Sequence, residues 1–278
     1  MAEESNSNQD GANGGNFVVA CLGGDRTALE ARPVPRPGPG EMVLGLRVVG
    51  FCGTDLFKLD TGAAQAGTVL GHELVGEVIA LGQGVGKFQD GDRVAVPHHV
   101  PCGDCFYCRR GCETMCEVFR QNLLEPGAFA DTILVRARAV EQAARLIPEH
   151  LSDEAAVFME PAACVLRGLH RADLVADGAA VVLGAGSMGL LHLLVLGAAY
   201  PGVAVTVVDP VEERRALADK LGASHTAARG AEALDAVLSS TKGFRSDAVV
   251  DPVGGKDIVQ DVLDLSRPGA TSVSSAQS

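Results

Sequence analysis

The chain has 278 residues, 47% of them hydrophobic, which is enough for a sizeable core and for two domains. Asp and Glu total 35 against 23 Lys and Arg, and the net charge of −12 argues against nonspecific binding to nucleic acid or to an anionic membrane. With no Trp and two Tyr, the chain is also a poor stacking platform for bases.

Residues 1–16 predict a disordered tail, because they are rich in Ser, Asn, Gly and acidic groups. No basic start is followed by an apolar run, so this segment does not resemble a secretory signal. No uninterrupted apolar stretch reaches the length of about 18 residues that a membrane span needs. We therefore expect a cytoplasmic protein with reduced thiols and no membrane partner.

The segment from residue 17 to about residue 145 is typical of a β-rich domain. Apolar runs at 43–49 and 74–79 are bounded by Gly and Pro, a pattern that favours short strands separated by turns. The proline-rich stretch 33–40 predicts a loop, since proline fixes φ and has no N–H to donate. We expect an all-β or α+β domain here.

Farther along the chain, the pattern changes to alternating strands and helices. Ser152 is a predicted helix N-cap, and Pro161 is expected to break or restart that helix. Alternation of strand and helix implies a parallel sheet covered by helices. We expect the domain boundary between residues 150 and 177. The predicted strands are 179–183, 203–208 and 247–250, and the predicted helices are 188–199 and 212–221.

The first of these strands leads into the motif G-x-G-x-x-G, formed by Gly184, Gly186 and Gly189. The first Gly makes the turn, the second lets the backbone approach a pyrophosphate, and the third allows close helix packing. Ser187 and Met188 lie at the start of the following helix, whose free N–H groups would hold the phosphates. The strand–turn–helix context makes this a predicted dinucleotide site.

Asp209 ends the next strand and is the predicted ligand of the cofactor ribose. A carboxylate there accepts hydrogen bonds from the ribose hydroxyls and repels a 2′-phosphate, so NAD is favoured over NADP. Arg214 and Arg215 follow closely and could bind such a phosphate. A solvated helix face is the preferred interpretation of these two arginines.

Cys102, Cys105, Cys108 and Cys116 form the pattern C-x2-C-x2-C-x7-C. This spacing predicts a structural zinc ion held by four thiolates, which leave no position for a substrate. Disulfides and an iron–sulfur cluster are the alternatives. Cys112 lies in the same loop but off the pattern, and is interpreted as a spare thiol.

Three other segments carry candidate ligands: Cys52 after an apolar strand, His72-Glu73 at the start of another, and Glu160 before a helix. A catalytic zinc takes three protein ligands and keeps a fourth position open. Taken singly, each candidate has an ordinary interpretation: packing for Cys52, a turn pair for His72-Glu73, and a helix N-terminal charge for Glu160.

Together these features resemble the zinc-containing medium-chain dehydrogenase/reductase (alcohol dehydrogenase) family. The resemblance rests on Gly71-His72-Glu73, Cys52-Gly53-Thr54-Asp55, the four-cysteine lobe and the glycine motif, and covers roughly residues 17–268. It implies an α/β chain: a β-rich GroES-like catalytic domain at 17–160 and a Rossmann doubly wound parallel sheet that binds NAD at 161–278. Glu160-Pro161 resembles the sorbitol dehydrogenase branch.

The resemblance also implies roles for single residues. Cys52 and His72 become ligands of a catalytic zinc, Glu73 a ligand or a close partner of one, and Glu160 either of these. Thr54 becomes the hydroxyl that accepts the substrate's proton; the alternative is a turn residue bonded to its own backbone. Many relatives carry His where this chain has Phe57, so the far end of the proton path must differ.

The predicted function is a zinc-dependent oxidoreductase that transfers hydride between a secondary alcohol or polyol and NAD, with two zinc ions per chain. The segment after Gly269 is too polar for a good buried strand, so we expect a truncated C-terminus. A non-catalytic zinc- and nucleotide-binding remnant is therefore the alternative, and homo-oligomerisation depends on an intact sheet edge. Cys21, Cys164 and His192 are expected to be packed core. His98 and His99 are expected to lie in a loop near the cleft, where a metal role is the poorly motivated alternative.

Overall fold

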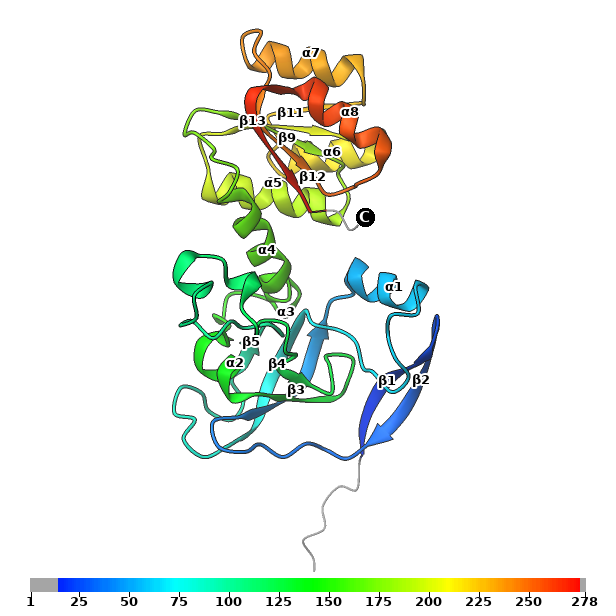
Figure 1. Cartoon of the computed structure of the whole chain (residues 1–278), viewed down its shortest axis with the longest axis vertical. Helices are drawn as coiled ribbons and strands as arrows, with labels where there is room; N and C mark the ends of the chain where they lie inside the picture. The colour runs from blue at the N-terminus through cyan, green and yellow to red at the C-terminus, as the bar shows by residue number, and fades with distance from the viewer. Residues whose placement is uncertain (1–14, 276–278) are drawn as a thin grey trace, which may run out of the picture. The chain divides into compact units, whose positions relative to one another are not determined.

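The computed structural model describes residues 15–275, which divide into two compact units between Glu160 and Pro161. Figure 1 shows the elements of each unit, and the units are described separately. Most of the predicted disordered tail, residues 1–14, lies outside the described residues. The prediction was wrong at its end, because β1 begins at Asn16, whose side-chain amide donates to Thr132 O (2.9 Å) and whose Oδ1 accepts from Thr132 N (2.9 Å).

The first unit is built on a six-stranded sheet in the order β6-β7-β3-β4-β5-β8, in which every neighbouring pair is antiparallel. A separate hairpin, β1–β2, carries the buried Cys21, as predicted. The strands are β1 Asn16–Gly23, β2 Arg26–Arg32, β3 Met42–Val49, β4 Leu74–Leu81, β5 Arg93–Ala95, β6 Leu124–Glu125, β7 Thr132–Val135 and β8 Arg145–Leu146. The helices are α1 Gly53–Asp60, η1 Cys108–Arg110, η2 Glu113–Met115, α2 Ala137–Gln142 and α3 Asp153–Ala156.

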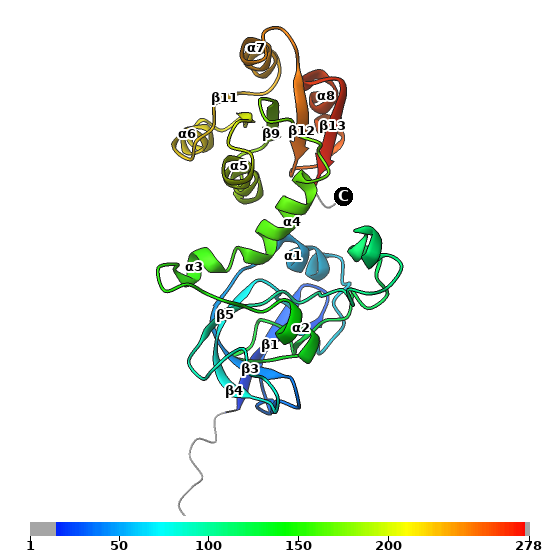
Figure 2. The same cartoon turned by 90° about the vertical axis from the view of Figure 1, so that its left-hand side faces the viewer.

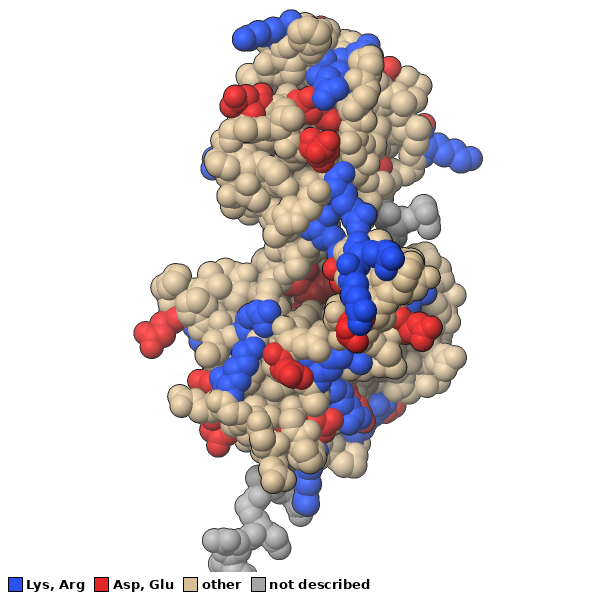
Figure 3. Space-filling view, turned by 60° about the vertical axis from the view of Figure 1, so that its left-hand side comes forward, with Lys and Arg blue, Asp and Glu red and all other residues tan. Residues whose placement is uncertain are grey.

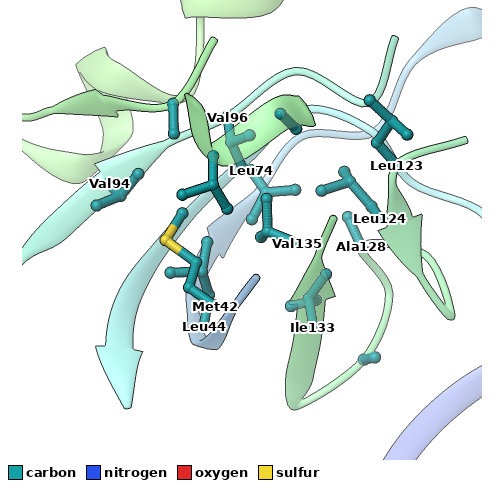
Figure 4. Close-up of a cluster of buried hydrophobic side chains, with 14 of the residues drawn as sticks. Met42, Leu44, Leu74, Val94, Val96, Leu123, Leu124, Ala128, Ile133 and Val135 are labelled. Atoms are coloured by element: carbon teal, nitrogen blue, oxygen red, sulfur yellow. The ribbon is translucent and has the colours of Figure 1, made fainter. Parts of the chain in front are cut away.

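The core of this unit lies between the sheet strands and the segments that cross them, as Figure 4 shows. Met42 and Leu44 of β3 face Ile133 and Val135 of β7, and all four are fully buried. Burying a side chain of this size stabilises a fold by about 1.5–3 kcal/mol. The short apolar runs that predicted strands are therefore also the source of the unit's stability.

The second unit is a five-stranded parallel sheet in the order β11-β10-β9-β12-β13. Alternate residues of β9 enter different cores: Ala180 and Val182 pack with α5, and Val181 and Leu183 pack with α7 and α8. Figure 2 shows the resulting three layers, with α5 and α6 on one face and α7 and α8 on the other. The strands are β9 Ala179–Leu183, β10 Ala204–Val208, β11 His225–Ala227, β12 Ser246–Asp251 and β13 Ser266–Ser274. The helices are α5 Ser187–Ala199, α6 Glu212–Lys220, α7 Ala231–Ser240 and α8 Lys256–Leu265, and α4 Met159–Leu169 begins two residues before the boundary between the units.

The polar segment around Gly269 forms a strand after all. We expected it to be too polar for a buried strand, yet β13 pairs in parallel with β12, for example Val273 with Val250. The strand is half-exposed and has one sheet neighbour among the described residues, so Ser and Thr side chains reach solvent there. Pro268 is tolerated because an edge strand need not donate every N–H.

Two further predictions about single residues have opposite outcomes. His192 is packed as expected: it is 1% exposed, and its Nδ1 lies 2.8 Å from Met188 O. The prediction for Cys164 was wrong, because this thiol is exposed on α4 although its helical neighbours Val165 and Leu169 are buried. Apolar spacing on a short helix did not fix which face turns inward.

The helix breaks and restarts just before Pro161, close to the position that the sequence predicted. Ser152 caps α3, accepting from Ala155 N at 3.2 Å, and α3 ends at Ala156. α4 then starts at Met159, so Pro161 lies in the first helical turn, where its missing N–H has no carbonyl to bind.

No helix among residues 15–275 is long and apolar enough to cross a membrane. Figure 3 shows basic as well as acidic side chains on the drawn face of each unit.

Candidate functional site

Cys52, His72 and Glu73 meet at one point of the first unit. Cys52 is the N-cap of α1, and His72-Glu73 directly precedes β4. One ligand atom from each of the three residues lies within 4.8 Å of those from the other two. Thiolate, imidazole and carboxylate are all zinc ligands, and three of them leave a fourth position open. The donor set therefore fits a catalytic rather than a structural zinc ion.

Two glycines give this cluster the room that it needs. Gly71 has φ +86°, a conformation that L side chains rarely adopt, and a Cβ there would lie 3.0 Å from Phe129 N. A Cβ on Gly50 would overlap the carboxylate of Glu73. Gly50 N also donates to Glu73 O at 2.7 Å, which ties the end of the strand before α1 to the start of β4. The local sequence thus fixes where the ligands emerge.

Asp55 contacts the ligand residues and holds them in place, a role that the sequence did not predict. It is 1% exposed, and its Oδ1 lies 3.5 Å from His72 Nδ1. Its two oxygens also accept from Gly71 N and Cys52 N, each at 3.3 Å. The contact uses Nδ1 and leaves Nε2 as the imidazole nitrogen available to an ion. The available signal was an acid three residues after the N-cap, where a side chain reaches back to the cap.

The electrostatics of this pair follow from burial and hydrogen bonding. Burial lowers the pKa of His72, but its hydrogen bonds with Asp55 and Cys52 outweigh burial and raise that pKa to about 10. Burial would raise the pKa of Asp55, yet the hydrogen bond with His72 lowers it. Because a metal needs neutral imidazole and thiolate, loading an ion here must displace protons.

Glu160 and Thr54 are placed differently from the three clustered residues. Glu160 is the second residue of α4, and the ligand cluster found among residues 15–275 does not include it. Thr54 is half-buried in the first turn of α1, two positions from Cys52. Phe57 lies farther along the same helix and is 47% exposed. The structure thus favours Glu73 over Glu160 as the carboxylate beside Cys52 and His72.

A stack of rings extends from the cluster. The His98 ring centroid lies 4.7 Å from that of His72 and 3.6 Å from that of His99, and the His99 centroid lies 5.3 Å from that of Phe119. Burial, with the positive charge on His99 as the next cause, lowers the pKa of His98 to about 3. His98 Nδ1 is buried and has no hydrogen-bond partner among the described residues. The sequence predicted both histidines in a loop and gave little reason for a metal role.

The four predicted cysteines of the lobe also come together. Sγ of Cys102 lies 3.6 Å from that of Cys116 and 3.9 Å from that of Cys108, and Sγ of Cys105 lies 3.5 Å from that of Cys108. Hydrogen bonds from the backbone N–H groups of Asp104 and Cys105 lower the pKa of Cys102 to about 6. Backbone donors of this kind stabilise a thiolate. Four sulfurs in one cluster fit a zinc ion with four tetrahedral ligands and no open position.

Cys112 stays outside that cluster, as the spacing predicted. Its Sγ lies 3.7 Å from Arg110 O, and it is not among the four grouped sulfurs. Gly103 and Gly111 have φ of +80° and +68°, which lets the loop turn its cysteines inward.

The glycine motif adopts the predicted strand–turn–helix geometry. Gly184 has φ +95° and donates to Val208 O at 2.6 Å, and Gly186 is the N-cap of α5. A Cβ on Gly189 would overlap Gly184 O, so the third glycine is needed for close packing. Ser187 and Met188 are the first two residues of α5, where backbone N–H groups have no partner within the helix. Such a helix start suits a phosphate.

Asp209 lies at the end of β10 as predicted, but its carboxylate bonds to the backbone. It is 2% exposed; Oδ2 accepts from Ala185 N at 2.7 Å and Oδ1 from Val211 N at 2.8 Å. Arg215 Nη1 donates to Asp209 O at 2.7 Å, so that arginine is not free in solvent. Arg214 Nη1 lies 3.9 Å from Asp209 Oδ2. The carboxylate therefore holds the glycine turn against the next strand end.

One unit carries the candidate metal clusters and the other carries a glycine turn of the dinucleotide-binding type, and comparison with known proteins agrees with both. The alcohol dehydrogenase GroES-like domain profile matches residues 38–145, and the zinc-binding dehydrogenase profile matches residues 186–277. The chain belongs to the zinc-containing medium-chain dehydrogenase family. It is thus an oxidoreductase, and the alternative of a non-catalytic remnant is not favoured.

Three similar proteins illustrate the family. A medium chain reductase/dehydrogenase of Acremonium sp is 33% identical over 90% of this chain and 90% of its own length. D-altritol 5-dehydrogenase of Agrobacterium fabrum is 34% identical over 89% of this chain and 72% of its own length. The crystal structure of an Escherichia coli alcohol dehydrogenase complexed with NADH has a TM-score of 0.80 and 26% identity, and covers 95% of this chain and 77% of its own.

Proposed function

We propose that this chain is a zinc-dependent dehydrogenase that passes hydride between a secondary alcohol or polyol and NAD. Residues 17–160 would supply the catalytic domain and residues 161–278 the NAD-binding domain. The observation that carries the proposal is the meeting of Cys52, His72 and Glu73 within 4.8 Å of one another. A cytoplasmic location, in which thiols stay reduced, accompanies it.

Each residue of the cluster has a defined task. Cys52, His72 and Glu73 would hold the catalytic ion, and Asp55 orients His72 through Nδ1. Zinc at an open site acts as a Lewis acid on a hydroxyl oxygen and makes that hydroxyl easier to deprotonate. Thr54 would accept the hydroxyl proton, because a hydroxyl group can accept and donate at once. Phe57 cannot carry this proton onward, so water or the cofactor ribose would receive it from Thr54.

The second unit would bind the nicotinamide cofactor, which supplies the hydride acceptor when bound. The start of α5, at Ser187 and Met188, offers backbone N–H groups to the pyrophosphate. Asp209 keeps the glycine turn in place, and its carboxylate disfavours a 2′-phosphate nearby. NAD is therefore the proposed cofactor.

The proposed substrate class rests on two observations. The Glu160-Pro161 pair resembles the sorbitol dehydrogenase branch, and one similar protein is a D-altritol 5-dehydrogenase. Both favour a sugar alcohol as the substrate. Simple secondary alcohols are the second choice. The four-cysteine lobe would hold a second, structural zinc ion, which makes two per chain.

The test is a substrate panel with protein of measured zinc content. Secondary alcohols and polyols are offered with NAD and, separately, with NADP, and reduced nicotinamide is followed by absorbance. We expect turnover of at least one polyol with NAD, abolished by a chelator and restored by zinc. A zinc-loaded, folded protein that turns over no alcohol would refute the proposal, and a clear preference for NADP would refute the cofactor assignment.

A further inference from the structure

The second unit has a cavity of about 370 Å³ at the amino ends of its parallel strands. Its wall includes Ala179, where β9 begins, whereas the glycine turn follows Leu183 at the other end of that strand. Five residues of extended chain separate the two ends by about 16 Å. Dinucleotides bind at the carboxyl ends of parallel strands, and the cavity is large enough for a small molecule of its own.

Two of the charged side chains in the wall neutralise each other. Asp247 Oδ1 accepts from Arg267 Nε at 2.6 Å, and Oδ2 accepts from Ala179 N at 2.8 Å. Burial would raise the pKa of Asp247, yet the hydrogen bonds from Ala179 N and from Arg267 lower it, so this carboxylate is ionised. Arg267 Nη1 donates to Pro268 O at 3.0 Å, which leaves Nη2 as the guanidinium nitrogen available to a ligand.

Two further charges in the wall have opposite signs and no protein partner. Arg245 and Asp177 are both exposed, and neither side chain forms an ion pair or a hydrogen bond with any residue from 15 to 275. A Cβ built on Gly202, which also lines the cavity, would lie 3.6 Å from Asp177 Oδ1, so the carboxylate lies at the wall. The cavity therefore offers a cation and an anion that are both unpaired within the described chain.

Apolar side chains complete the wall. Phe244 is 70% exposed and Val175 is 55% exposed. Covering apolar surface is favourable by about 25 cal/mol for each Å² removed from water. One ligand that carries both charges and an apolar group would satisfy all of these features together.

We propose that this cavity binds a free α-amino acid with an aromatic or large apolar side chain. The α-carboxylate pairs with Arg245 and with Nη2 of Arg267, because a planar guanidinium matches a carboxylate. The α-ammonium pairs with Asp177, and the side chain covers Phe244. A ligand with one charge leaves either Arg245 or Asp177 unpaired. This site lies beyond the proposed function, at the opposite end of the sheet from the glycine turn.

The experiment compares three compounds that share a phenyl group and differ in charge. Calorimetric titration of the full-length, zinc-loaded protein uses L-phenylalanine, 3-phenylpropanoate, which lacks the ammonium, and 2-phenylethylamine, which lacks the carboxylate. We expect L-phenylalanine to bind at least about tenfold more tightly than either analogue, the value of one hydrogen-bonded charge at a partly exposed site.

Two variants assign the charges to their partners. Arg245→Gln should weaken L-phenylalanine binding about tenfold and leave 2-phenylethylamine unchanged, and Asp177→Asn should weaken it equally and leave 3-phenylpropanoate unchanged. Lys242→Gln, which removes an exposed charge from the same loop outside the cavity wall, is the matched control. All three side chains are exposed, so the thermal midpoints should stay within about 2 °C of wild type.

Titration in the presence of NAD completes the test. Since the two ends of β9 are well separated, bound NAD should leave the affinity for L-phenylalanine unchanged. The inference would be overturned by no measurable binding of L-phenylalanine, by equal affinity for the three compounds, by unchanged binding in both variants, or by displacement of L-phenylalanine by NAD. Turnover is not part of any of these measurements, so a failure of the proposed function would be seen separately.

Discussion

The two candidate metal clusters of the first unit are built in different ways. The four-cysteine cluster comes from one loop, in which the residue spacing and two left-handed glycines bring the sulfurs together. The cluster of Cys52, His72 and Glu73 comes from two segments, joined by a backbone hydrogen bond from Gly50 and by the buried Asp55. A closed set of four ligands can only stabilise, whereas an open set of three can also react. Removing a ligand should therefore have different consequences in the two places.

The largest effect is expected from Cys52→Ser. Loss of this thiolate weakens the open site, and Lewis-acid assistance of several kcal/mol corresponds to a fall in kcat/KM of about a thousandfold. The thermal midpoint should change by less than about 3 °C, because Cys52 is only half-buried at a helix N-cap and leaves the core intact. Zinc analysis should give one ion per chain instead of two. A fully active variant would show that the ion is not held there.

The opposite result is expected from Cys116→Ser in the lobe. Cys116 is 4% exposed, and its sulfur belongs to the closed cluster. Loss of that ion should lower the thermal midpoint by about 10 °C, the equivalent of roughly 3 kcal/mol for a domain of this size. Activity measured well below the new midpoint should stay within about threefold of wild type. Cys112→Ser, in the same loop but outside the cluster, is the matched control and should leave the zinc content unchanged.

The third ligand of the open site can be assigned by comparing Glu73→Gln with Glu160→Gln. An amide is a weaker zinc ligand than a carboxylate, so Glu73→Gln should lower zinc affinity about 10- to 100-fold. Glu160 lies outside the cluster of the described residues, and its variant should lose less than about threefold. Competition with a chromophoric chelator measures both. The reverse order of effects would make Glu160 the ligand.

Local patterns in the sequence predicted much of the fold and of the candidate sites. The cysteine spacing, the glycine motif and the alternation of strand and helix each depend on neighbours in the chain, and the structure has all three in the predicted places. The segment after Gly269 was expected to be too polar for a buried strand, and β13 has no buried residue although it pairs with β12.

The supporting residues could not be predicted in the same way. Asp55 contacts His72 and the His98 ring lies beside that of His72, although both partners are distant in sequence from it, and nothing local distinguishes Asp55 from an ordinary helix-start acid or His98 from a loop histidine. Asp209 was placed correctly, but its contact with Ala185 N depends on how two strand ends meet. Tertiary contacts decide such roles, and a single sequence does not contain them.

The smallest expected effect tests whether the two clusters respond to a disturbance elsewhere in the unit. Asp153, at the start of α3, pairs with Arg47 of β3 and Arg93 of β5, each at 2.7 Å. Asp153→Asn should lower the thermal midpoint by about 3 °C, since partly exposed ion pairs are worth little, and both zinc ions should remain.

That difference should also depend on pH with a defined sign. The hydrogen bond from Arg47, followed by that from Arg93, lowers the pKa of Asp153 below its ordinary value. A carboxylate with a lowered pKa in the folded state stabilises the protein above the ordinary pKa and loses that contribution as the pH falls through the lowered value. The midpoints of wild type and Asp153→Asn should therefore differ at neutral pH and converge in acid. If the variant instead lost zinc from the open site, α3 would have to be counted among the elements that hold the ligands, and the cluster would depend on more of the fold than the contacts of Gly50 and Asp55.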